Sequence, residues 1–95
     1  MKYYKKIFSS LSATRAMDVY MCIYLHGKKE EYPMFEEIAK ELKMNKNTLR
    51  KLTNLLSRNK MIYSAQPNKE ADKRKRVYLV EDNRLAELLL QIWTL

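Results

Sequence analysis

Basic residues without acidic neighbours are concentrated in one segment of this 95-residue sequence. Residues 43–60 contain six lysines and arginines and no aspartate or glutamate. Polar and basic side chains recur there at the spacing of one helix face, at Asn47, Arg50, Lys51, Asn54 and Arg58. Such a face can donate hydrogen bonds to phosphate oxygens and to base edges. The pattern favours binding to a polyanion, most commonly a nucleic acid, and the alternative is a solubilising surface.

Catalytic chemistry finds little support in the residues. The only histidine, His26, follows the only cysteine, Cys22, by four residues on one helix face. Two such ligands from each of two chains could form a tetrahedral metal site. A single cysteine and histidine near the end of a helix more often have a structural role, so we expect no metal and no cofactor. The adjacent carboxylates of Glu30–Glu31 and Glu36–Glu37 diverge within a helix. With no phosphate-binding loop and no nucleophile motif, we expect no enzymatic activity.

Composition sets the class of protein. Hydrophobic residues make up 46% of the chain and charged residues 32%, which is typical of one soluble domain spanning residues 1–95. The net charge is +8. No apolar run reaches the 18 or more residues that span a bilayer, and a single cysteine is compatible with a reducing compartment. We therefore expect a cytoplasmic protein without a membrane partner.

Helical periodicity predicts three helices before the basic segment. The first covers residues 3–11. The second is expected to be capped by Ser10 or Ser12 and to stop at Gly27. The third covers Phe35–Leu42, with acidic residues near its N-terminus.

The basic segment and the residues after it predict a further helix, two strands and a last helix. Asn45 is a good N-cap for a helix over about 46–58. Residues 61–63 and 77–80 are rich in strand-forming side chains on either side of a polar tip. Asp82 or Asn83 is expected to cap the last helix. The fold class is therefore mainly α with a small β-hairpin, in the order helix-helix-helix-helix-strand-wing-strand-helix, which is a winged helix-turn-helix.

The stretch from Ser12 to Val80 resembles the winged-helix regulators of the MarR type, and particularly their SarA-like relatives. The matching segments are Phe35–Leu42, Met44–Leu49, Leu52 and Leu55, Met61–Ile62, Asp72–Arg74 and Val77–Val80. Two departures stand out. Asn59-Lys60 replaces the glycine that usually follows the recognition helix, and asparagine is expected to preserve the turn. The C-terminal end is shorter than is typical, so we expect no long dimerisation helix and no small-molecule effector.

The resemblance assigns the helix 46–58 to the major groove. Six side chains are predicted to bind DNA there: Lys46, Asn47, Thr48, Arg50, Lys51 and Asn54. The two long basic residues at 50 and 51 could read guanine, and the asparagines could pair with adenine. The residues of the first turn could hold phosphate.

The wing is expected over residues 67–76. The resemblance implies that Asp72 pairs with an arginine and that Arg74 reaches the minor groove or its phosphates. Lys73 and Arg76 are predicted to contact phosphate. The alternative is an exposed hairpin with incidental charge.

The terminal helices, over about 2–11 and 83–95, carry more apolar surface than a small monomer should expose. They lie where the family builds its dimer interface, for which we predict Tyr4, Phe8, Leu88, Leu89, Ile92 and Trp93. The alternative is packing of the two ends against their own domain. Some relatives use a helix cysteine as an oxidation sensor, a role that Cys22 could fill if it is exposed.

These features predict a homodimeric, sequence-specific regulator of transcription that binds double-stranded DNA. Two recognition helices one DNA turn apart would require a roughly palindromic site. One alternative is a plasmid or viral protein that organises DNA in partition or replication. Another is a winged-helix module that binds only proteins.

Overall fold

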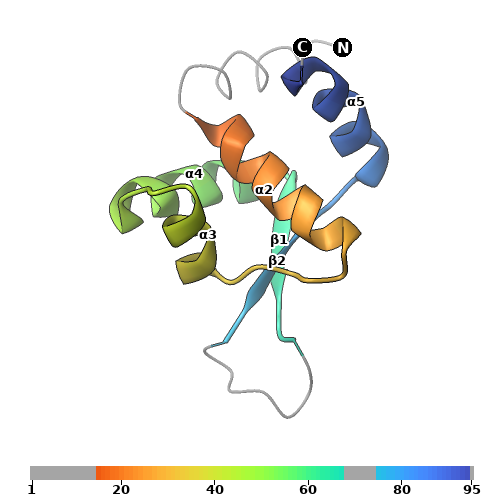
Figure 1. Cartoon of the computed structure of the whole chain (residues 1–95). Coiled ribbons are helices and arrows are strands. Elements are labelled where there is room, and N and C mark those ends of the chain that lie inside the picture. Colours follow the sequence, from red (N-terminus) through yellow and green to blue (C-terminus); the bar gives the residue numbers. More distant parts are fainter. Residues whose placement is uncertain (1–14, 68–74, 95) are drawn as a thin grey trace.

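The computed structural model describes residues 15–67 and 75–94 as four helices and a two-stranded antiparallel hairpin (Figure 1). The elements are α2 (Ala16–Lys28), α3 (Phe35–Glu41), α4 (Lys46–Arg58), β1 (Ile62–Ala65), β2 (Val77–Val80) and α5 (Asn83–Trp93). Their order is the one expected for a winged helix-turn-helix. The helix predicted over residues 3–11 lies outside the described residues. No helix in the described part is long and apolar enough to cross a membrane.

Helix α2 is the centre of the core. It packs against α3, α4, α5 and β2, and it crosses the middle of the molecule in Figure 1. Val19, Tyr20 and Ile23 on this helix are fully buried. Met21, which falls on the opposite side of the helix from Val19, is fully buried as well, because α2 is surrounded by other elements.

Both predicted ends of α2 are wrong. Arg15, in the left-handed conformation, is the N-cap in place of Ser10 or Ser12, and it makes no side-chain capping bond. Gly27 does not stop the helix but lies within its last turn. The left-handed residue that follows the helix is Glu30, with φ of 58°. The reversal thus occurs after the C-cap Lys29, whose N–H still bonds to His26.

The other helix starts are set by local capping groups. The side chain of Asn45 accepts a 2.7 Å hydrogen bond from the N–H of Asn47, which confirms the predicted cap of α4. Asp82, one of the two predicted residues, caps α5 by accepting from two N–H groups. In α3, the carboxylate of Glu37 accepts from the N–H of Met34, a bond of the capping-box type.

The turn after α4 survives without glycine, but not through asparagine. Asn59 has a negative φ of −90° and its amide donates to the carbonyl of Leu55. The left-handed position falls on Lys60, with φ of 56°. Strand β1 then runs to Ala65, two residues beyond the predicted segment.

One additional β-bridge connects the hairpin to the segment that precedes α3. Ile62 pairs with Val80 and Ala65 with Val77 in the antiparallel register. The segment before α3 joins β2 through a bridge between Met34 and Val77, and the N–H of Tyr78 donates to the carbonyl of Pro33. This bridge places the start of α3 beside the first residues of β2, so the helix-turn-helix and the hairpin form one unit.

Candidate nucleic-acid interface

The outward face of α4 carries all six residues predicted to bind DNA from that helix. Its inward face is formed by Leu49, Leu52 and Leu56, which are buried in the core. Thr53 is also buried, and its hydroxyl donates to the carbonyl of Arg50. The polar side chains at the other positions of the helix face solvent. The exposed residues are Lys46, Asn47, Thr48, Arg50, Lys51, Asn54, Ser57 and Arg58. The helix has no acidic residue in its sequence, so its outer face is uniformly neutral or positive.

Contacts from α3 orient two of these side chains. The guanidinium of Arg50 lies 5.1 Å from the centroid of the Phe35 ring, a cation–π arrangement. The ammonium of Lys46 lies 3.3 Å from a carboxylate oxygen of Glu36, and both side chains are largely exposed. A surface ion pair of this kind contributes at most about 1 kcal/mol, so Lys46 remains available to another anion.

The described part of the wing is exposed, and Arg76 is already engaged. Its Nε donates to the hydroxyl of Ser64 at 3.0 Å, and a terminal nitrogen donates to the Ser64 carbonyl at 2.9 Å. These bonds link β1 with the residue before β2 and use two of the five guanidinium N–H groups. The remaining wing predictions, Asp72, Lys73 and Arg74, lie outside the described residues.

Helix α5 presents part of the predicted dimer interface. Leu88 and Ile92, one turn apart, are 60% and 49% exposed. Trp93 is also exposed, and its indole N–H donates to Asp18 of α2 at 3.2 Å. Leu89 is only 8% exposed and packs into the core of its own chain, which removes it from the face that a partner could reach. Tyr4 and Phe8 lie outside the described residues.

A polar contact fixes α5 on α2. The hydroxyl of Tyr24 donates to the carboxylate of Glu87, and Lys28 lies 3.6 Å from the same carboxylate. The hydrogen bond to Glu87 raises the pKa of Tyr24 to about 12, and the same bond lowers the pKa of Glu87. The apolar stripe of α5 is therefore presented in a defined orientation relative to the core.

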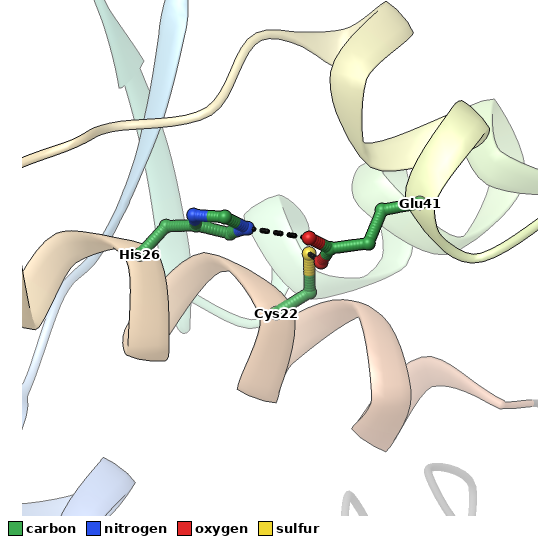
Figure 2. Close-up of side chains that lie close together, drawn as sticks. All are labelled: Cys22, His26 and Glu41. Carbon is green, nitrogen blue, oxygen red and sulfur yellow. Dashed lines mark hydrogen bonds and ion pairs between the residues drawn. The ribbon is translucent and has the colours of Figure 1, made fainter.

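A second polar cluster joins α2 to α3. Cys22 and His26 point from successive turns of α2 toward Glu41, the last residue of α3 (Figure 2). The Cys22 thiol donates to one carboxylate oxygen of Glu41, and Nε2 of His26 donates to the other, each at 2.8 Å. Cys22 is 7% exposed.

The cluster determines the protonation state of the Cys22 thiol. Burial, and then the hydrogen bond to Glu41, raise the pKa of Cys22 to about 12, so the metal-free thiol is protonated at neutral pH. Oxidation sensing by Cys22 was predicted only if the residue is exposed, and it is buried. A protonated thiol also reacts slowly with oxidants. The pKa of Glu41 is lowered by the hydrogen bonds from Cys22 and His26. The spacing of Cys22 and His26 is visible in the sequence, but nothing there indicates that Glu41 joins them.

Solved structures of similar shape are winged-helix proteins that differ widely from this chain in sequence. The structure of AF1382 from Archaeoglobus fulgidus is 16% identical, with a TM-score of 0.69 over 83% of this chain and 84% of that one. The MepR–DNA complex from S. aureus is 20% identical, with a TM-score of 0.69 over 98% of this chain and 77% of MepR. Staphylococcus aureus MarR in complex with salicylate and kanamycin is 19% identical, with a TM-score of 0.53 over 96% of this chain and 73% of MarR. These likenesses establish the fold, a winged helix of the MarR type.

The sequence itself is matched by one protein family. No curated protein matches the chain. The family described as the TFIIE alpha subunit matches residues 4–91, which include every element described above except the last two residues of α5. The chain, a winged helix that resembles the MarR-type regulators in fold, therefore belongs to the TFIIE alpha subunit family.

Proposed function

We propose that the protein is a dimeric, sequence-specific DNA-binding regulator of transcription, with α4 in the major groove and the hairpin on the minor groove or the backbone. The observation that carries the proposal is the outer face of α4, where eight polar or basic side chains are exposed and acidic residues are absent. Arg50 and Lys51 are suited to the O6 and N7 atoms of guanine, and Asn47 and Asn54 to adenine.

The first turn of α4 supports the same placement. The N–H groups at a helix N-terminus attract phosphate, and Lys46 and Thr48 lie exposed beside them. These contacts hold the protein on DNA of any sequence, while the base contacts distinguish one site from another. MepR, which has a similar fold, has been solved in complex with DNA.

The dimer is supported by the exposed stripe on α5. Leu88 and Ile92 are large apolar side chains exposed side by side on one helix, and a second copy of the chain would cover them. A twofold dimer presents two recognition helices to successive turns of DNA, which multiplies the contacts and selects a roughly palindromic site.

Fluorescence anisotropy tests this proposal with two duplexes of equal length, one from the region upstream of the protein's own gene and one of random sequence. Both are titrated at low and at physiological salt. We expect tight, single-step saturation of the upstream duplex only. The double variant Arg50→Ala/Lys51→Ala should abolish that preference, and Lys29→Ala/Arg84→Ala, which removes the same charge elsewhere, should retain it.

The other outcomes separate the remaining functions. Equal and cooperative binding to both duplexes would indicate a protein that coats or organises DNA. Failure to bind either duplex at low salt would contradict a DNA-binding function and would leave a module for protein contacts.

A further inference from the structure

We propose that Cys22, His26 and Glu41 form a binding site for one divalent transition-metal ion of the zinc class. The sulfur, one imidazole nitrogen and one carboxylate oxygen lie within 4.8 Å of one another, and they come from two helices that pack together. Figure 2 shows all three side chains directed at the same point between α2 and α3.

The distances fit a tetrahedral ion after small side-chain rotations. Zinc lies about 2.3 Å from a cysteine sulfur and about 2.0–2.2 Å from nitrogen or oxygen, so its ligands are roughly 3.3–3.6 Å apart. The two 2.8 Å hydrogen bonds reach different carboxylate oxygens of Glu41. Because the three ligand atoms lie within 4.8 Å of one another, the widest separation has to close by at most roughly 1.5 Å to reach these values. The ion would take the place of the two hydrogen-bonding protons.

The donor set selects the class of metal. A thiolate, an imidazole and a carboxylate suit zinc and its neighbours, whereas magnesium and calcium prefer oxygen ligands alone. The four-residue spacing of Cys22 and His26 places both ligands on one face of α2, as chelation by a helix requires. On binding, the thiol loses its proton to solvent and the sulfur bonds as the thiolate. The proton on Nε2 of His26 moves to Nδ1, or to solvent if Nδ1 is already protonated, so that the ring ligates as a neutral imidazole.

The site also has a route of entry and room for a fourth ligand. An open cavity of about 680 Å³ lies against it, and its lining includes His26, Glu41, Glu31 and Lys40. A water molecule on the cavity side would complete the coordination, since three protein ligands leave one position open.

Binding would link α2 to Glu41 at the C-terminal end of α3, where the turn toward α4 begins. The metal would therefore stabilise the packing of the helix-turn-helix on the core. Because an ion that binds only the folded state shifts the unfolding equilibrium, the melting temperature should rise with zinc concentration.

Cobalt titration of the untagged, reduced protein tests the site directly. Cobalt(II) should bind once per chain and produce the intense visible bands of tetrahedral coordination together with a thiolate-to-cobalt charge-transfer band, and zinc should abolish both. The chain has a single cysteine and a single histidine, so the charge-transfer band can come only from Cys22.

Three variants and one control assign the ligands. Cys22→Ser should lose the charge-transfer band, and His26→Gln and Glu41→Gln should each weaken binding by at least about tenfold. Glu31→Gln removes another carboxylate of the cavity wall and should leave affinity unchanged. His26 and Glu41 are partly exposed, so these variants should fold even if the buried Cys22→Ser does not, and the melting curve of each metal-free variant checks this.

Absence of a charge-transfer band on cobalt addition, or an unchanged affinity in both His26→Gln and Glu41→Gln, would overturn the site. Either result is independent of DNA binding, because the assay contains no DNA.

Discussion

The guanidinium of Arg50 stacks over the ring of Phe35, with 5.1 Å between the cation and the ring centroid. Phe35 begins the first helix of the helix-turn-helix and Arg50 lies on the second, so the contact crosses the elbow of the motif. A cation–π contact at an exposed site contributes about 0.5–1 kcal/mol and restricts the side chain. The structure thus limits the freedom of Arg50 before any DNA is bound.

Arg50→Ala should weaken binding to a specific DNA site by about 1–3 kcal/mol and relax the base preference at one position of that site. The reason is the loss of a bidentate contact with guanine. Binding to a series of single-base variants of the site measures both effects. Arg84→Ala, which removes an exposed arginine from α5, is the matched control. A uniform loss over all base variants would instead assign Arg50 to phosphate.

Lys46→Ala should lower affinity for all sequences alike and reduce the dependence of the binding constant on salt. Each lost phosphate contact lowers the slope of log K against log salt by about 0.9 per bound protomer. Glu36→Gln should tighten binding, because Glu36 forms an ion pair with Lys46 and repels the phosphates. Lys29→Ala is the control for charge. An unchanged slope in Lys46→Ala would remove this residue from the phosphate contacts.

Ile92→Glu should dissociate the dimer at micromolar concentration, because it places a charge in the exposed apolar stripe of α5 where burial without a partner is costly. Sedimentation velocity measures the change. Gln91→Glu introduces the same charge at the adjacent exposed position and should leave the dimer intact. A wild-type protein that is monomeric at this concentration contradicts the dimer.

Tyr24→Phe should remove part of the alkaline loss of stability. The folded pKa of Tyr24, about 12, lies above the ordinary value of 10.0, so the stability it contributes is complete below pH 10 and declines as the pH rises toward 12. Urea unfolding at several pH values from 9 to 12 measures the free energy of unfolding, which should decline less steeply with pH in the variant. Tyr63→Phe, at an exposed position of β1, controls for the loss of a tyrosine. Equal slopes in wild type and Tyr24→Phe would contradict the assigned role of the hydrogen bond to Glu87.

Local signals in the sequence were sufficient for most of the secondary structure. Asn45 and Asp82 can accept hydrogen bonds from N–H groups two or three residues away, so their capping roles depend on neighbours in the chain. The spacing of apolar residues likewise defines which face of α4 is buried, because side chains three or four positions apart lie on the same face of a helix. The winged-helix order and the composition of its outer face follow from these local rules.

The failures at the ends of α2 have a different origin. Gly27 carries the conformational freedom that favours a helix end, yet the helix continues through it and reverses at Glu30. Packing of α2 against four other elements outweighs the modest cost of a glycine within a helix, about 1 kcal/mol. At the end of α4, Lys60 takes the left-handed position that was expected of Asn59, because the chain must turn there into β1.

The sequence by itself determined the order of the elements over the described residues, the basic face of α4 and the apolar stripe of α5, since each depends on residues a few positions apart. Only the tertiary structure placed Leu89 in the core, Phe35 under Arg50, and Glu41 between Cys22 and His26. Glu41 is 15 residues from His26 and reaches it because α3 packs on α2. Contacts of this kind depend on how whole helices dock, and the free energy of docking is spread over the entire core, so no local pattern encodes them.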